Sequence, residues 1–347
     1  MSTNAQPTFT GRLIAVFIGL MLLLTLAEAA SRFVMPRWSE FYSGRFMRAV
    51  YDGRFGWFAM GVPGFDGWFA QNNGDFRARI HINDFGLRDN QPISYADGAI
   101  WVIGDSMTFG WGVEEDERYS TVVSRLLGQP TYNIASPGTN VCGYRALVSQ
   151  MPEAVTPTAV IIGLVLENDL MEYDCAARAA SGPPADSERL MGVKIWLTGH
   201  SALYNVVAGN LKRVDIIHQA LIAIGLANQE QAYKQEFASA RVDAVTTSTA
   251  NELANLRNQL PAGTPYAVLI VPARFEIADG DPPYHHARVA LAKSLAEHGI
   301  GVIDPFDAFK AAGFKPTHFV HDGHWSPLGH RLAGEAAAEW LRANLRR

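Results

Sequence analysis

Short, continuous apolar runs alternate with helical stretches from Ala99 onward, and this alternation limits the fold more than any other feature of the sequence. The runs cover residues 99–104, 159–166, 267–271 and 300–303, with a weaker candidate at 131–134. Strands that are apolar on both faces are typical of a parallel sheet that helices cover on each side. The sequence therefore predicts an α/β fold built on an open parallel sheet.

The predicted helices occupy residues 118–127, 231–260, 285–298 and 327–345. The last of them starts with Ser326 as N-cap and Pro327 at the first helical position, which are standard start signals. Residues 176–230 do not fit the alternation of strands and helices. We expect them to form an insertion that begins as a loop and continues as helix.

The N-terminus is markedly apolar, since residues 13–26 carry no charge. Ala27-Glu28-Ala29 follows and resembles a signal-peptidase site, so a cleaved signal peptide is one interpretation. An uncleaved membrane anchor over residues 13–30, a little shorter than the usual ~20 residues, is the other. A buried core helix is less favoured, because a helix placed ahead of any domain pattern has little to pack against. Both main interpretations place the rest of the chain at or beyond a membrane.

The chain divides into three predicted parts: residues 1–30 as signal peptide or anchor, 31–97 as a small β-rich segment, and 98–347 as the main domain with the insertion. Turn signals and the alternating stretch at residues 77–82 indicate β structure in the second part. The formal net charge is −5 and the basic residues are scattered, so a nucleic-acid partner is not expected.

Polar residues follow the predicted strands at the points where ligands bind in open parallel sheets, namely the carboxyl ends. They fall in four short segments, at residues 105–110, 135–140, 168–169 and 321–326. Ser106 lies in a tight strand-to-helix turn, which exposes a serine hydroxyl near free backbone N–H groups. Such a hydroxyl needs a base, which His324 can supply, and Asp322 can hold the imidazole in the required tautomer.

An oxyanion formed at Ser106 needs hydrogen-bond donors. The backbone N–H groups of Ser106 and Gly138 and the side-chain amide of Asn168 are the candidates. Each such donor typically lowers the barrier by ~3 kcal/mol. The sequence thus predicts a nucleophilic serine, a base with its orienting acid, and an oxyanion hole.

These segments resemble the conserved blocks of the SGNH/GDSL hydrolases. The four blocks are Gly104-Asp105-Ser106 with Thr108-Phe109-Gly110, Asn133 through Gly138, Asn168-Asp169, and Asp322 with His324. The resemblance spans roughly residues 80–345 and implies a flavodoxin-like, three-layer α/β/α fold and ester hydrolysis without a cofactor. It also implies a substrate that carries an acyl group, such as a small molecule, a glycan or a lipid.

Residues 82–88 (INDFGLR) resemble a segment that precedes the first block in bacterial, membrane-anchored members of the superfamily. This resemblance implies a catalytic domain outside the inner membrane, in the periplasm, or a secreted protein after signal cleavage. The arginines around the apolar stretch favour the opposite orientation, because one precedes it and four follow it. We give the resemblance more weight than this count.

The blocks depart from the family pattern in three places. Met107 replaces the leucine of GDSL, and Leu166 stands where the third block usually has glycine. In the last block a single residue, Gly323, separates Asp322 from His324. Asp-x-His-Trp is the spacing of the alginate-type O-acetyltransferases, so acyl transfer to an exported polysaccharide is an alternative to hydrolysis. A non-catalytic envelope protein is the third alternative, and the intact set of blocks argues against it.

Several neighbouring residues have simpler interpretations. We expect Asp105 and Asp169 to brace turns, Trp325 to pack in the core, and Arg274 to form a surface salt bridge rather than to meet a charged substrate. We expect His318, His321 and His330 to be structural or exposed, and no metal site, because no second cluster of ligands accompanies them.

Cys142 and Cys175 are the two cysteines of the chain, and each follows an active-site block. The predicted fold places both on loops at the same edge of the sheet, within reach of a disulfide. An oxidising compartment would preserve the bond. The alternative is that both are free cysteines packed as small hydrophobic residues.

Overall fold

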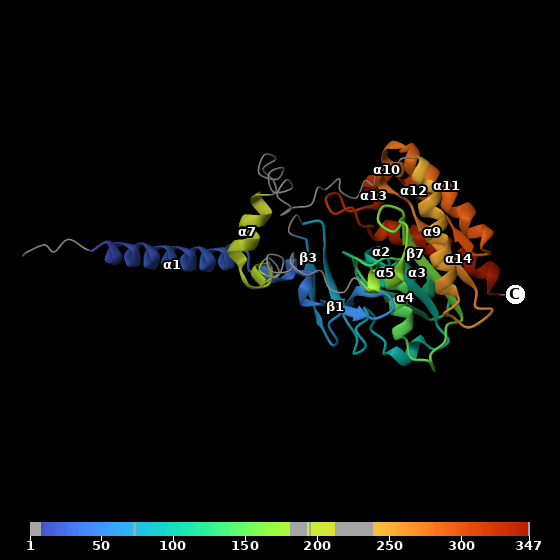
Figure 1. The fold of residues 1–347 in the computed structure, drawn as a ribbon, viewed down its shortest axis with the longest axis horizontal. Coiled ribbons are helices and arrows are strands. Elements are labelled where there is room, and N and C mark those ends of the chain that lie inside the picture. Colours follow the sequence, from blue (N-terminus) through green and yellow to red (C-terminus); the bar gives the residue numbers. More distant parts are fainter. Residues whose placement is uncertain (1–7, 72–73, 181–192, 194–195, 212–238, 346–347) are drawn as a thin grey trace, which may run out of the picture. The chain divides into compact units, whose positions relative to one another are not determined.

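The computed structural model describes residues 8–71, 74–180, 193, 196–211 and 239–345 (Figure 1). The described residues belong to two compact units. One lies within residues 1–42 and 186–228, and the other within residues 43–185 and 229–347. Each unit is described by itself.

A five-stranded parallel sheet forms the centre of the larger unit. Its strands are β5 (Ile100–Gly104), β6 (Thr131–Ala135), β7 (Ala159–Val165), β8 (Tyr266–Val271) and β9 (Gly301–Ile303). They are ordered β6-β5-β7-β8-β9, and every neighbouring pair is parallel. This is the flavodoxin-like order with the first strand next to the switch point, where such sheets bind ligands.

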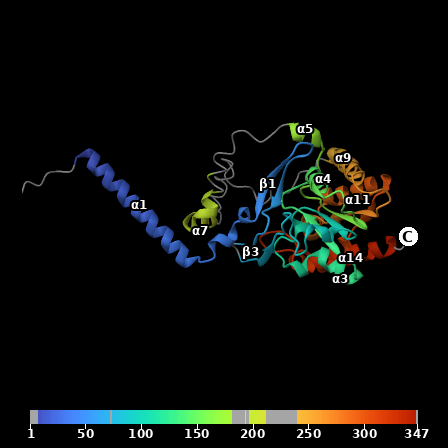
Figure 2. The same cartoon turned by 90° about the horizontal axis from the view of Figure 1, so that it is seen from below.

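Helices cover both faces of this sheet, as Figure 2 shows. On one face lie α4 (Val141–Gln150), α9 (Ser239–Arg257) and α11 (Pro282–Glu297), and their apolar side chains share one core with β5, β6, β7 and β8. On the other face lie α3 (Tyr119–Leu127) and α14 (Pro327–Asn344), which enclose a second core. The predicted three-layer α/β/α fold is therefore confirmed.

Two antiparallel hairpins precede the sheet. Strand β1 (Met47–Asp52) pairs with β2 (Gly56–Gly61), and β3 (Asp66–Ala70) pairs with β4 (Arg77–His81). A third apolar cluster joins the hairpins to the sheet and to the helix that follows β5, through Phe46, Phe69, Phe76, Ile80, Ile82, Phe109 and Ala135. The predicted β-rich character of this segment is thus observed.

Short helices complete the larger unit. They are η2 (Ser43–Arg45), η3 (Ile93–Ala96), α2 (Ser106–Phe109), η4 (Glu115–Glu117), α5 (Cys175–Ala180), α10 (Arg274–Asp279), α12 (Phe306–Ala312) and α13 (Phe314–Thr317).

The smaller unit contains α1 (Phe9–Val34), η1 (Trp38–Phe41) and α7 (Ala202–Leu211). Helix α1 has 26 residues, a mean hydropathy of 2.4 and no buried residue in its most apolar window, and it is long enough to cross a membrane. The carboxylate of Glu28, near its end, accepts hydrogen bonds from the backbone N–H groups of Ala202 and Leu203 at 3.0 and 2.9 Å. Glu28 therefore caps the N-terminus of α7.

Three secondary-structure predictions need correction. Helix α4 was not expected, because seven of its ten residues are buried and its polar side is reduced to Arg145, Ser149 and Gln150. The insertion does not begin as a loop: α5 starts at Cys175, and the Asp174 carboxylate accepts from the Ala177 N–H at 2.8 Å as a cap. Helix α9 ends at Arg257 rather than 260. Residues 231–238 and much of the insertion lie outside the described residues.

Candidate active site

The nucleophile turn follows β5 directly. Asp105 caps the short helix α2, and its Oδ1 accepts from the Met107 N–H at 2.9 Å. Ser106 is thereby fixed as the first residue of α2, at the carboxyl edge of the sheet. A Cβ added at Gly104 would lie 2.1 Å from Thr108 Oγ1. The turn can close this tightly because glycine stands there.

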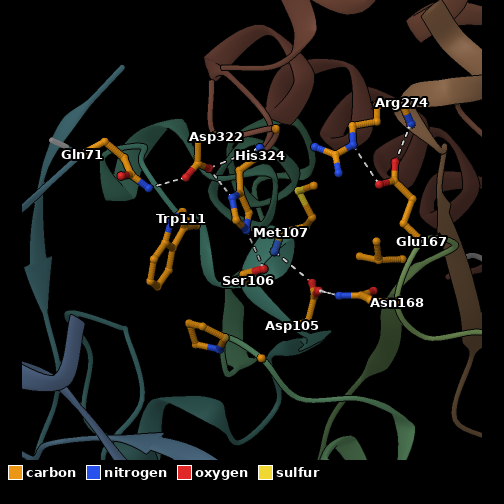
Figure 3. A pocket seen from close by; sticks show the side chains of 14 residues that line it. Gln71, Asp105, Ser106, Met107, Trp111, Glu167, Asn168, Arg274, Asp322 and His324 are labelled. Atoms are coloured by element: carbon orange, nitrogen blue, oxygen red, sulfur yellow. Dashed lines mark hydrogen bonds and ion pairs between the residues drawn. The ribbon is translucent and has the colours of Figure 1, made fainter. Parts of the chain in front are cut away.

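Ser106, His324 and Asp322 form one hydrogen-bonded chain (Figure 3). The Ser106 hydroxyl lies 2.8 Å from His324 Nε2, and Asp322 Oδ1 bonds to His324 Nδ1 on the other side of the ring. Burial raises the pKa of the Asp322 carboxyl, but its hydrogen bond with His324 and the charge of that imidazole outweigh burial and hold this pKa below its ordinary value. Asp322 therefore stays ionised and can stabilise an imidazolium at His324.

A pocket of about 380 Å³ opens at this chain of residues. The residues that line it are Gln71, Asp105, Ser106, Met107, Trp111, Pro137, Gly138, Val165, Glu167, Asn168, Arg274, Asp322, Gly323 and His324. All the residues predicted to react or to bind the oxyanion thus face one cavity, although they come from segments more than 200 residues apart.

On the oxyanion side, Gly138 and Asn168 line the pocket with Ser106. Gly138 has a φ of 73°, a left-handed conformation that glycine adopts without strain. The Asn168 Nδ2 group donates to Asp105 Oδ2 at 3.1 Å, which fixes the amide beside the nucleophile. An amide carries two N–H donors, and Asp105 engages one of them.

Asp105 and Asp169 brace this side. Burial raises the pKa of both carboxyls, and the charge of Asp105 raises the pKa of Asp169 further. Asp169 Oδ2 accepts from the Tyr144 hydroxyl at 2.7 Å and from the Val165 N–H at 2.9 Å. Asp105 thus holds the Met107 N–H and the Asn168 amide, and Asp169 holds the Val165 N–H. Both contacts agree with the expectation that these two carboxylates brace turns.

A disulfide lies behind the oxyanion side. Cys142 and Cys175 are joined with their Cα atoms 5.5 Å apart. Both cysteines lie in the first turns of helices, α4 and α5, and the expectation of two loop cysteines is wrong. The bond links the helix that follows Gly138 to the segment that follows Asn168.

The INDFGLR segment holds the loop after the nucleophile. The fully buried Arg88 donates to the carbonyl oxygens of Phe109 and Val113 at 3.1 and 2.7 Å, and also to Gly110 and Arg79. Asn83 Oδ1 accepts from three successive backbone N–H groups and so shapes the turn that presents Arg88. From the sequence this segment indicated only where the protein is located. In the structure it supports the loop that follows Ser106.

The remaining histidines lie away from the reacting atoms. His318 and His330 are buried, and burial lowers the pKa of each to about 3, so both are neutral. His321 is exposed and bonds to Asp75 at 2.7 Å. Trp325 is fully buried and packs against Tyr119 and Phe309. Within the described residues, no group of three or more His, Cys, Asp or Glu side chains could hold a metal ion.

Arg274 does not form a surface salt bridge. Its guanidinium pairs with Glu167 at 2.9 Å in the wall of the pocket, where the two side chains are only 20% and 12% exposed. Burial raises the pKa of Glu167, and the nearby Arg274 opposes that rise. The pair follows from packing of two strand ends that the sequence places far apart, β7 and β8.

Two unpredicted pocket residues contact the acid–base pair. Gln71 Nε2 donates to Asp322 Oδ2, and the Trp111 ring lies 5.6 Å from the His324 ring between centroids (Figure 3). Neither belongs to a recognisable block. Trp111 stands five residues after Ser106, so its proximity to the nucleophile was the one available signal; Gln71 gave none.

Comparisons with known proteins give structural matches only. No family model matches the chain, and no curated protein matches it. Among solved structures, a lipolytic protein of the G-D-S-L family from Veillonella parvula is 16% identical, with a TM-score of 0.39, and the match covers 70% of this chain and 96% of that one.

Two further structures match over a similar share of the chain. A lipase/acylhydrolase from Enterococcus faecalis is 13% identical, with a TM-score of 0.41 and coverage of 71% of this chain and 96% of that one. A carbohydrate esterase family 2 enzyme from Corynascus thermopiles is 15% identical, with a TM-score of 0.41 and coverage of 72% and 67%. The chain is thus similar to solved structures of the G-D-S-L and SGNH hydrolases, the superfamily that its four sequence blocks resemble.

Proposed function

We propose that this protein is an SGNH-type serine esterase that cleaves an acyl ester through a covalent acyl-enzyme. One observation carries the proposal: the Ser106 hydroxyl lies 2.8 Å from His324 Nε2, while Asp322 binds the opposite nitrogen of the same ring. A nucleophile, a base and an orienting acid in hydrogen-bond reach are the arrangement that activates a serine. This geometry also argues against a non-catalytic envelope protein.

The first half of the reaction forms the acyl-enzyme. Ser106 Oγ attacks the ester carbonyl carbon while His324 Nε2 takes the hydroxyl proton. The tetrahedral intermediate then collapses, the carbon–oxygen bond to the alcohol breaks, and the imidazolium returns the proton to the leaving alcohol. Asp322 remains ionised throughout and stabilises the imidazolium.

The second half releases the acid. Water attacks the acyl carbon as His324 takes one of its protons, and collapse of the second intermediate breaks the bond to Ser106 Oγ, which recovers the proton. In both halves the negative oxygen lies among the N–H groups of Ser106 and Gly138 and the Asn168 amide. Because Asp105 holds that amide in advance, no reorganisation is needed when the charge develops.

The substrate we propose is an acylated cell-envelope molecule, such as a glycan, a lipid or a smaller ester. The pocket volume of about 380 Å³ is at the lower end of ligand sites and fits a short acyl group with part of its alcohol. Trp111, Met107 and Val165 give it apolar walls, and the Arg274–Glu167 pair gives it a polar one.

We place the catalytic domain outside the inner membrane, tethered by α1. At 1.5 Å per residue the 26-residue helix is about 39 Å long, enough for a hydrocarbon core of about 30 Å. Cleavage after Ala29 would remove Glu28, which caps α7, so the structure favours retention of α1 over a cleaved signal peptide. Export remains compatible with the disulfide.

Acyl transfer is the second candidate function. Asp322-Gly323-His324-Trp325 has the spacing of the alginate-type O-acetyltransferases, and the structure accommodates it because Gly323 has a φ of 82°. The acyl-enzyme is common to both reactions, which differ only in whether water or a sugar hydroxyl attacks it.

Product analysis with an activated acetyl ester separates the two candidates. The full chain in detergent should release acetate, and the Ser106→Ala variant should release none above background. If oligosaccharide acceptors gain acetyl groups and acetate release falls in proportion, transfer is the function. If the wild type and Ser106→Ala release acetate at the same rate, the esterase proposal is wrong.

A further inference from the structure

The β3–β4 hairpin contacts the loop that carries the acid–base pair at three points. Gln71 bonds to Asp322, Asp75 bonds to His321, and the Phe76 ring lies 5.2 Å from the Phe319 ring between centroids. The contacts extend along the loop from Phe319 to Asp322. The hairpin therefore holds this loop in place from outside the parallel sheet.

The contact at Gln71 differs from the other two because it reaches a reacting group. Asp322 is 7% exposed, its Oδ1 faces the His324 imidazole, and its Oδ2 accepts from Gln71. Only the NH₂ end of the amide can face a carboxylate, because the carbonyl end would be repelled. Both carboxylate oxygens are thus held, one by the ring and the backbone N–H of His324 and one by the hairpin.

Fixing the second oxygen has a mechanical consequence. A carboxylate held at one oxygen can rotate about its side-chain bonds, and rotation would misalign the ring that it orients. The residue between Asp322 and His324 is Gly323, which has no side chain that could restrict either of them. A side chain could not be added there, because a Cβ would lie 2.3 Å from the Arg274 guanidinium. The Gln71 amide, which donates to Asp322 on the side opposite His324, limits rotation of the Asp322 carboxylate.

We propose that Gln71 is a positioning residue for the acid–base pair, so that the β3–β4 hairpin forms part of the catalytic site. The inference rests on the proposed function, since it assigns Gln71 a role in activating Ser106 through Asp322 and His324. It goes beyond that function by making the reaction depend on a segment that lies before the first sequence block. The hairpin packs through Phe69 and Phe76, so its folding does not require the Gln71 amide.

The test measures how fast a fluorophosphonate labels Ser106 in the full chain in detergent. Gln71→Ala should slow labelling by about 10- to 100-fold, because a small misplacement of the base has effects of that order. With an ester substrate kcat should fall by a similar factor while KM stays nearly constant, since the amide does not touch substrate. Asp66→Asn, an exposed change in the same hairpin, should label at the wild-type rate.

Gln71→Glu supplies a readout that a purely structural role would not move. The introduced carboxyl can donate to Asp322 as the glutamine amide does while it is protonated, whereas its ionised form repels Asp322. The other titratable or charged groups around the site are His324, the Arg274–Glu167 pair, Asp105 and the Asp75–His321 pair, and they are the same in both variants. The ratio of the Gln71→Glu rate to the Gln71→Ala rate should therefore rise as the pH falls from about 8 to about 5.

Each outcome decides between the claims. Labelling of Ser106 at the wild-type rate in Gln71→Ala, or a Glu-to-Ala ratio that does not change with pH, would overturn the role of Gln71 and leave the esterase intact. A wild-type chain whose Ser106 is not labelled would refute the esterase, and this inference with it.

Discussion

The two halves of the site are held in place by different means. The nucleophile and oxyanion half lies on the sheet edge and is fixed by buried groups: Asp105, Arg88, Asp169 and the Cys142–Cys175 disulfide. The acid–base half lies on a loop between α13 and α14 and is held by the β3–β4 hairpin through Gln71 and its neighbours.

This difference suggests a division of roles. The first half needs rigid donors at fixed positions, which a packed sheet edge provides. The second half needs one imidazole to exchange a proton with two partners, and a few contacts around the loop suffice for that. Changes to the buried groups that brace the first half should therefore reduce stability, whereas changes in the second half should reduce activity with little loss of stability.

The largest effect is expected at His324. His324→Ala should reduce kcat/KM by at least ~10³-fold, because Ser106 loses its base. His321→Ala, three residues earlier in the same loop, should change kcat/KM by less than ~3-fold, since its ring does not reach Ser106 and its backbone N–H still donates to Asp75 in the variant. Ester hydrolysis by the full chain measures both, and equal damage in the two variants would break the assignment of the acid–base half.

Removal of the disulfide should have the next largest effect. Cys142 and Cys175 are separated by 33 positions in the sequence, and the chain-entropy model gives ~3–4 kcal/mol for a loop of this length. Cys142→Ser combined with Cys175→Ser should lower the free energy of unfolding by that amount in guanidinium titrations. A loss below ~1 kcal/mol would show that the oxyanion half does not depend on the bond.

Loss of Arg88 should destabilise the nucleophile half. Arg88→Met removes this donor from three buried carbonyl oxygens, those of Phe109, Gly110 and Val113, at ~1–3 kcal/mol for each, so a loss of at least about 3 kcal/mol is expected. Arg79→Met removes an arginine that is 62% exposed and should cost less than ~1 kcal/mol. Denaturant midpoints of the two variants test this contrast, and it fails if the midpoints coincide.

The smallest effect concerns pH and stability. Burial lowers the pKa of His330 to about 3 in the folded chain, whereas an unfolded histidine titrates near ~6.5. Between these values the unfolded chain binds the extra proton, so stability is full above pH ~6.5 and falls as the pH drops toward ~3. The melting temperature of the wild type should therefore fall more steeply below pH ~6.5 than that of His330→Asn.

His321→Asn is the matched control, because the His321 ring is exposed. The melting temperature of this variant should depend on pH as that of the wild type does. The buried carboxyls of Asp105 and Asp169, whose raised pKa values act in the opposite direction, are present in every variant and cancel in the comparison. Parallel curves for the wild type and His330→Asn would contradict a neutral buried His330.

The sequence predicted the sheet well because four of its five strands are apolar on both faces, and only β6, with Thr131 and Asn133, was a weaker candidate. All five strands were located to within about two residues, and Ser326 and Pro327 marked the start of α14 correctly. Helix α4 was missed because burial on most sides removes the periodic polar face that identifies a helix. Gly143, in the first turn of α4, adds a second misleading signal. Glycine is needed there because a Cβ would lie 1.6 Å from Thr139 Oγ1.

The candidate site was predicted in part for a similar reason. Ser106, Gly138, Asn168, Asp322 and His324 lie in short blocks, and parallel strands bring their carboxyl ends together. Gln71 reaches Asp322 across 251 residues, from a hairpin whose position depends on the packing of Phe69 and Phe76. No local pattern encodes such a contact. The Arg274–Glu167 pair is likewise made by tertiary packing.

Fluorophosphonate labelling followed by peptide mass spectrometry tests the central claim most directly. The full chain should gain one label, on the peptide that contains Ser106, and Ser106→Ala should gain none while its melting temperature stays near that of the wild type. His324→Ala should label at least ~10³-fold more slowly, because the hydroxyl is no longer activated. A label on another residue, or ester hydrolysis that persists in Ser106→Ala, would contradict the assignment of Ser106 as the nucleophile.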